Sequence, residues 1–173
     1  SYMQQKKIKN AVIAGGGFIG LEMAENLHHT GAKVSIVERG NQVMNPIDFS
    51  MASLVHKHLQ EKGIQLLLGE AVESFTGKDG RLTVHFKSGM ELESDLVLLS
   101  IGVKAETTLA LKAGLRLGEM QGIYVNRHLQ TSDENIYAVG DAIEYPHPIT
   151  GKPWLNFLAG PANRQARIVA DNM

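Results

Sequence analysis

Residues 11–20 of the sequence read AVIAGGGFIG, a short apolar run that enters a cluster of glycines. The run lacks the polar–apolar alternation of a half-exposed strand, so it predicts a strand buried on both faces, as in a parallel sheet. Residues 18–30 carry apolar side chains at helical spacing and are followed by Gly31, a residue typical of helix C-termini. A second apolar strand, 33–37, leads to Glu38, and this order of elements predicts a βαβ unit.

The glycine turn has the spacing that binds a dinucleotide. Gly15 permits a tight turn out of the strand, Gly17 lets a pyrophosphate approach the backbone, and Gly20 lets the helix pack closely on the strand. The first amides of the helix, with the positive end of its dipole, can then hold the phosphates. The residues expected at this phosphate site are Gly15, Gly16, Gly17, Phe18, Ile19 and Gly20. The motif serves both NAD and FAD, so by itself it leaves the dinucleotide open.

A carboxylate at the end of the second strand bears on this choice. Glu38 is placed to accept hydrogen bonds from the ribose hydroxyls of an adenosine, and its charge would repel a 2′-phosphate. Arg39 weakens this preference, because a neighbouring guanidinium can hold a phosphate. The sequence therefore favours NAD(H), with NADP(H) as the alternative.

The remaining pattern predicts the rest of the fold. Three short strands separated by glycine-containing turns are expected at 72–76, 81–86 and 90–92. The other expected elements are a helix at 47–62 with its apolar stripe in the core, strands at 64–68, 95–100, 123–125 and 136–139, a short helix at 106–113, a loop at 146–153 and a last helix from near Pro161. Together they predict an α/β, Rossmann-like three-layer domain. Its parallel sheet is expected to have helices on both faces and an antiparallel three-stranded meander in one crossover.

Composition excludes several classes of function. The chain has 17 Lys+Arg against 18 Asp+Glu, a balance that gives no electrostatic field to hold a nucleic acid or an anionic membrane. It has no cysteine, so disulfides, thiolate metal sites and cysteine catalysis by this chain itself are excluded. The seven histidines show no metal-ligand spacing, and neither a metal site nor a catalytic residue is predicted. With no apolar span or leader, the sequence predicts a cytoplasmic protein without nucleic-acid or membrane partners.

Three stretches resemble the pyridine nucleotide–disulfide oxidoreductases, flavoproteins with two dinucleotide-binding domains. They are VIAGGGFIGLE at 12–22, the meander that ends in LLSIG at 98–102, and TSDENIYAVGD at 131–141, which is similar to the family's second FAD fingerprint. Within the family, LAGPANRQ at 158–165 is most similar to coenzyme A-disulfide reductases and NADH-dependent persulfide reductases. The NADH oxidase and peroxidase branch is the alternative.

The resemblance implies roles for single residues. Phe18 matches an aromatic gate that covers the flavin; the alternative is that it only packs against its neighbours. Glu22 matches an acid near the nicotinamide ribose; the alternative is an acid on the helix surface with no ligand contact. Other positions that match cofactor contacts are Ala71 and Val72 beside the adenine, Gly102 at the nicotinamide, Gly140 and Asp141 at the flavin ribityl chain, and Leu158 and Ala159 near the flavin ring.

The resemblance also implies an incomplete enzyme. Residues 1–118 match an NAD-binding domain, and residues 119–173 match the C-terminal segment of a discontinuous FAD domain, expected to be truncated because the chain stops inside a helical pattern. The implied reaction carries hydride from NADH to FAD and, through a cysteine outside this chain, on to a disulfide or persulfide. This chain alone is expected to bind NAD(H), to hold FAD weakly or not at all, and to lack turnover.

The resemblance further implies that the complete protein is a homodimer. Two other hypotheses about the function compete with this one. A non-enzymatic NAD-sensing module needs no FAD fingerprint, so residues 131–141 argue against it. A single-domain dehydrogenase needs a Tyr/Lys or His/Asp set near the nicotinamide, and the sequence has none at a useful spacing.

Overall fold

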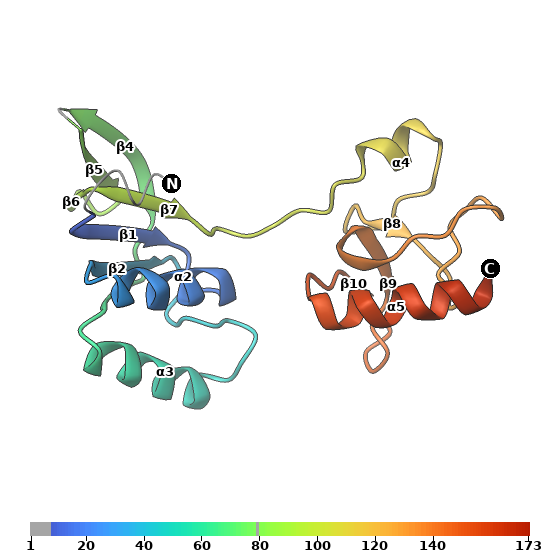
Figure 1. Ribbon diagram of the computed structural model, residues 1–173, viewed down its shortest axis with the longest axis horizontal. Coiled ribbons are helices and arrows are strands. Elements are labelled where there is room, and N and C mark those ends of the chain that lie inside the picture. The colour runs from blue at the N-terminus through green and yellow to red at the C-terminus, as the bar shows by residue number, and fades with distance from the viewer. Residues whose placement is uncertain (1–7, 79) are drawn as a thin grey trace. The chain divides into compact units, whose positions relative to one another are not determined.

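The computed structural model describes residues 8–78 and 80–173. The chain divides into two compact units, Ser1–Gly102 and Val103–Met173 (Figure 1). The division at residue 118 made from the sequence concerns the cofactor domain to which each segment belongs, and that assignment stays a prediction.

The first unit contains a parallel sheet, two helices and an antiparallel meander. Its elements are β1 (Asn10–Ala14), α2 (Phe18–His29), β2 (Lys33–Glu38), α3 (Phe49–Glu61), β3 (Gln65–Leu68), β4 (Val72–Lys78), β5 (Arg81–Phe86), β6 (Glu91–Ser94) and β7 (Leu96–Leu99). The parallel sheet has the strand order β3-β2-β1-β7, so the first strand lies between two neighbours. Ile13 of β1 is opposite Ile36 of β2 and Leu98 of β7. Every residue from Ala11 to Ala14 is buried, which confirms the inference from their unbroken apolar character.

Two helices cover one face of the parallel sheet, and the meander covers the other. Ala24 of α2 and Leu59 of α3 share a core with Ile13. On the opposite face, Phe86 of β5 packs with Val12 of β1. The three-layer architecture is confirmed, but the expectation of helices on both faces is wrong for this unit. The meander replaces the helix that would connect β3 to β7, and its own apolar face buries that side of the sheet equally well.

The meander and α3 show how far periodicity alone predicts burial. The strand order β4-β5-β6 is antiparallel, as predicted, and in β5 the buried Val84 and Phe86 alternate with the partly exposed His85. In α3, Leu59 is buried, but Met51 and Leu54 are 56% and 61% exposed. The expectation that the whole apolar stripe of this helix lies in the core is therefore wrong, because only one side of the helix faces the sheet.

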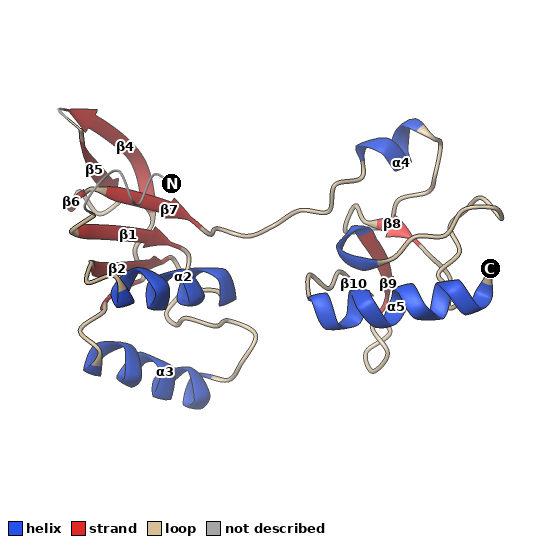
Figure 2. Cartoon of the chain, in the orientation of Figure 1, coloured by secondary structure: helices blue, strands red, loops and turns tan. Residues whose placement is uncertain are grey.

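The second unit is small, and short strands form its sheet. Its elements are α4 (Thr108–Lys112), β8 (Ile123–Tyr124), a 3₁₀ turn (Gly140–Ala142), β9 (Ile143–Pro146), β10 (Pro153–Trp154) and α5 (Ala159–Asn172), coloured by type in Figure 2. Its core is formed by Val125, Leu129 and Ile143. No helix in the described part of the chain combines the length and apolar character needed to cross a membrane.

Two predictions for this unit need correction. Residues 136–139 are not a strand: an isolated bridge joins Tyr137 to Gln130, and Ala138 and Val139 pack against the small core without belonging to a sheet. The segment 146–153 is not a plain loop, because Pro146 pairs with Pro153 where β9 meets β10. Prolines at the strand ends conceal this hairpin in the sequence.

Candidate functional site

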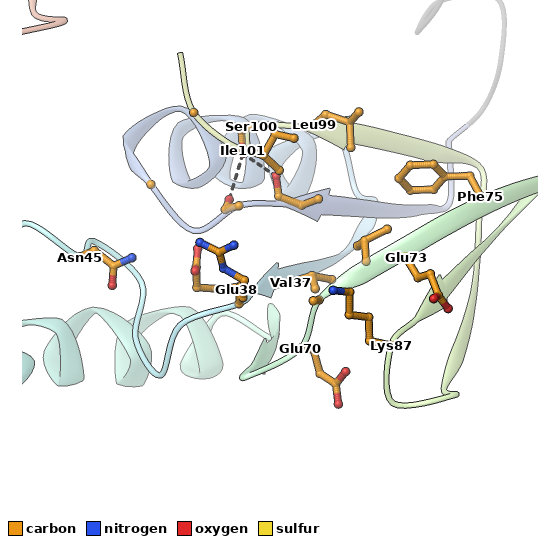
Figure 3. A pocket seen from close by; sticks show the side chains of 17 residues that line it. Val37, Glu38, Asn45, Glu70, Glu73, Phe75, Lys87, Leu99, Ser100 and Ile101 are labelled. Carbon is orange, nitrogen blue, oxygen red and sulfur yellow. Dashed lines mark hydrogen bonds between the residues drawn. The ribbon is translucent and has the colours of Figure 1, made fainter. Parts of the chain in front are cut away.

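A pocket of about 640 Å³ lies at the carboxyl ends of β1, β2 and β7 (Figure 3). Its walls come from the glycine turn, the ends of these strands, the start of β4 and the turn after β5. The carboxyl edge of a parallel sheet is where ligands bind in open α/β folds, and the volume is that of a small-molecule site.

The structure gives different physical reasons for the glycines of the turn. Gly15 has φ 112°, and a Cβ there would collide with the carbonyl of Ser100. A Cβ on Gly20 would collide with the carbonyl of Gly15, so α2 passes very close to the end of β1. A Cβ on Gly17 would meet no atom within 4 Å apart from those of its neighbours in the chain. Packing therefore explains two of the glycines and leaves open space beside the third.

The start of α2 leaves its amides without side-chain partners. Gly17 is the N-cap residue and has no side chain to accept their hydrogen bonds, and the first turn carries no acidic residue. The unpaired N–H groups and the positive end of the helix dipole are therefore not neutralised by the helix itself. This arrangement suits an anionic ligand.

Glu38 is held in place by the backbone. Its Oε2 accepts a hydrogen bond from the Gly16 N–H and its Oε1 accepts one from the Gly40 N–H, both at 2.8 Å. A Cβ on Gly16 would also crowd Val43 and Glu38, which accounts for the middle glycine of the row. A carboxylate oxygen accepts more than one hydrogen bond, so the half-buried Glu38 keeps acceptor capacity toward the pocket.

Ser100 contributes to the site, although the sequence suggested only a strand end there. Its N–H donates to the Ala14 carbonyl at 2.8 Å. Its hydroxyl lies 3.1 Å from the carbonyl oxygen of Ala14 and 3.0 Å from that of Gly15, dashed in Figure 3. The end of β7 thereby fixes the glycine turn. The signal that could have located it is the position of Ser100 at the end of an apolar strand, two residues before Gly102, the glycine that matches the nicotinamide turn.

The structure brings only part of the site residues predicted for the first unit into the pocket. Of these predicted residues, the pocket is lined by Gly15, Gly17, Glu38, Arg39, Ala71, Val72 and Gly102. The predicted residues outside its lining are Gly16, Phe18, Ile19, Gly20 and Glu22. Phe18 and Ile19 are each about half exposed, and Glu22 is exposed on α2. The roles that the resemblance assigns to Phe18 and Glu22 stay predictions.

In the second unit, a glycine turn is attached to the last helix. Gly140 has φ 78°, and its N–H donates to the Gln165 side-chain oxygen at 2.8 Å. Asp141 follows in the 3₁₀ turn and is exposed. α5 begins at Ala159, with Leu158 as an N-cap that makes no side-chain hydrogen bond. Within residues 8–78 and 80–173, no group of three or more histidine, aspartate or glutamate side chains is arranged to hold a metal ion.

Comparisons with known proteins agree with the resemblance. The model of the pyridine nucleotide-disulphide oxidoreductase family matches residues 1–156. A CoA-dependent NAD(P)H sulfur oxidoreductase of Pyrococcus abyssi is 36% identical over 173 residues, which cover 99% of this chain and 38% of that protein. The chain thus spans well under half the length of this curated relative.

Solved structures support the same grouping. Reduced CoADR-RHD of Bacillus anthracis superposes with a TM-score of 0.94 at 44% identity, covering 99% of this chain and 30% of that one. An NAD-dependent persulfide reductase from A. fulgidus gives a TM-score of 0.94 at 37% identity, covering 99% of this chain and 32% of that one.

Proposed function

Because the chain belongs to the pyridine nucleotide-disulphide oxidoreductase family, we propose that its first unit is the NAD(H)-binding part of an FAD-dependent oxidoreductase. The enzyme would carry hydride from NADH to FAD and on to a disulfide or persulfide. The observation that carries the proposal is the pocket in which the open Gly17 backbone and the Glu38 carboxylate meet at the carboxyl edge of the sheet. Sulfur substrates are favoured over oxygen or peroxide by the names of the sulfur oxidoreductase and persulfide reductase relatives.

In this proposal the chain binds and orients the coenzyme. The amides at the start of α2 donate to the pyrophosphate, whose approach needs the room beside Gly17. Glu38 accepts the ribose hydroxyls of the adenosine half with the acceptor capacity that its two backbone donors leave free. Ala71 and Val72 lie on the adenine side, and Gly102 lies on the nicotinamide side.

The second unit belongs, in this proposal, to the FAD domain. Residues 1–118 form the NAD-binding domain, and residues 119–173 supply Gly140, Asp141, Leu158 and Ala159 to a flavin site completed by other parts of a homodimeric protein. FAD supplies the redox chemistry when bound. The residues here fit such a group, because Gln165 holds the Gly140 turn and the start of α5 leaves amides without side-chain caps. The redox cysteine lies elsewhere, since this chain has none.

Calorimetric titration of this chain with NADH and NADPH tests the proposal. We expect NADH to bind and to bind more tightly than NADPH. Equal or tighter binding of NADPH would overturn the role given to Glu38, and absence of NADH binding would overturn the site. The visible spectrum of the complete protein separates the enzyme from a coenzyme-sensing module, because only the enzyme requires a flavin band.

A further inference from the structure

A lysine from the meander lines the pocket near Glu38. Lys87 follows β5 directly, in the turn toward β6, and its side chain forms part of the pocket wall. Figure 3 shows this side chain entering the pocket from the meander side, with its ammonium directed toward Val37 and Glu38. The sequence gives no reason to connect residue 87 with the end of β2, because the two belong to different sheets.

Hydrogen bonds connect the two positions through a short segment after β3. The Lys87 N–H donates to the Ala71 carbonyl at 2.9 Å, and the Glu70 N–H donates to the Glu38 carbonyl at 3.2 Å. The Ser88 hydroxyl also donates to the Glu70 carboxylate at 2.9 Å. Glu70 and Ala71 are neighbours in the chain, so the backbone that carries Lys87 is attached through them to the backbone that carries Glu38.

In the part of the chain that the structure describes, the two cations of the pocket form no ion pair. Arg39 and Lys87 line the pocket together with Glu38, Glu70 and Glu73. Over the described ranges 8–78 and 80–173, the ion pairs with N···O distances up to 4.0 Å involve neither cation. Glu38, in contrast, already accepts two backbone hydrogen bonds. A positive charge on each of two elements is therefore available to a ligand at the ribose end.

We propose that Lys87, together with Arg39, binds the 2′-phosphate of NADPH. The site then binds NADPH as well as NADH, and these two residues set how far it discriminates between the coenzymes. The inference rests on the proposed NAD(H) site and deepens it: Glu38 recognises the ribose hydroxyls, and the two cations offset its repulsion of a phosphate. NADH stays the tighter ligand. The contact of an exposed ammonium with a phosphate is a point-charge attraction, so it contributes modestly and weakens with salt.

The test uses the whole chain, four ligands and a matched pair of variants. NADH, NADPH, adenosine 5′-monophosphate and adenosine 2′,5′-bisphosphate are titrated calorimetrically into wild type, Lys87→Gln and Lys78→Gln. Lys78 is an exposed lysine of the same meander that does not line the pocket. We expect Lys87→Gln to weaken NADPH and the bisphosphate about fivefold and to leave the other two ligands within about twofold. Lys78→Gln should change none of them, and the NADPH loss should shrink as salt is raised.

Each outcome separates this inference from the proposed function. Wild type that binds NADH but not NADPH, a Lys87→Gln variant with unchanged NADPH affinity, or equal losses for all four ligands would each overturn the role of Lys87 while leaving the NAD(H) site intact. Wild type that binds no NADH would overturn the site itself. Lys87→Arg, which keeps the charge, should bind NADPH within about twofold of wild type, and a loss there comparable to that of Lys87→Gln would contradict the charge argument.

Discussion

At the scale of single residues, the glycines of the turn between β1 and α2 look alike in the sequence and differ in their surroundings. Gly15 and Gly20 are required by packing, because a Cβ on either would collide with a backbone carbonyl. A Cβ on Gly17 would have open space around it, with no atom within 4 Å apart from its neighbours in the chain. Packing does not require this glycine, so our proposal attributes it to the approach of the pyrophosphate.

Gly17→Ala should therefore separate binding from folding. The new methyl group enters open space, so we expect the free energy of unfolding to fall by about 1 kcal/mol or less, the cost of alanine at an N-cap. NADH affinity should fall at least about tenfold, because the methyl group occupies the path of the pyrophosphate. Urea denaturation and calorimetric titration measure the two effects.

Gly20→Ala is the matched contrast. Its methyl group collides with the Gly15 carbonyl, so the variant should lose about 1–3 kcal/mol of stability through overpacking. If Gly17→Ala were as destabilised as Gly20→Ala, or bound NADH as wild type does, the space beside Gly17 would not be the coenzyme site.

Glu38→Gln should change which coenzyme is preferred. An amide keeps one acceptor oxygen but turns an NH₂ group toward a backbone donor, Gly16 or Gly40, and loses the charge. We expect NADH affinity to fall about tenfold and NADPH affinity to stay the same or rise, measured by paired titrations. Glu61→Gln, on the exposed side of α3, serves as the control. A parallel loss of both coenzymes would show that Glu38 acts on the turn rather than on the ribose.

At the scale of elements, β1 is the centre of the first unit because its edges and its faces are all occupied. It pairs with β2 and β7 at its edges and packs against helices on one face and the meander on the other. Its start is fixed to the corner between β6 and β7. There Asp95 accepts the N–H groups of Asn10 and Lys9, each at 2.9 Å, and returns its own N–H to the Asn10 carbonyl.

This corner makes stability depend on pH. The N–H groups of Asn10 and then Lys9 hold the pKa of the Asp95 carboxyl below its ordinary value of 3.8. A carboxyl whose pKa is lower in the folded state stabilises the fold above its unfolded pKa, and this contribution is lost as the pH falls through the folded pKa. We expect Asp95→Asn to be less stable than wild type at pH 7, and the difference to shrink as the pH falls from about 5 toward 3. Denaturant titrations over this range measure it.

The control for this prediction is Asp171→Asn, an exposed substitution in α5 that should leave stability unchanged. A difference between Asp95→Asn and wild type that stayed constant down to the lowest pH would mean that the charge of Asp95 does not contribute.

At the scale of the whole molecule, the two units differ in the extent of their buried hydrophobic cores. The first unit has a cluster of buried residues on each face of its sheet. The second has a core of three buried residues, and α5 buries none of its side chains. A helix with an apolar stripe and no buried residue fits a domain that other parts of a protein complete.

We therefore expect this chain, purified alone, to bind NADH, to retain no stoichiometric flavin and to show no NADH-dependent disulfide reduction. The physical reason is that the proposed flavin contacts at Asp141 and the start of α5 form only part of a site, while the coenzyme pocket lies wholly within the first unit. Visible absorption of the purified chain, before and after denaturation, measures bound flavin. Stoichiometric flavin would contradict the proposed division of the FAD domain.

Much of the first unit was predictable because its signals are local. The apolar run of β1, the glycine spacing and the periodicity of α2 all lie within 20 consecutive residues, and the structure has these elements within a residue of their predicted bounds. The short strands of the second unit were less predictable, since two-residue strands such as β8 and β10 are defined by pairing and not by pattern. For the same reason residues 136–139 have strand-like composition and form no strand.

The sequence alone determined the α/β class, the family resemblance and the positions of the glycine turn and Glu38, because hydrophobic period and glycine spacing act between near neighbours in the chain. Only the tertiary structure decided that Ser100 fixes the glycine turn, that the meander covers the second face and that Lys87 lines the pocket with Glu38. Those relations join residues far apart in the chain, and they depend on how strands pair and layers stack.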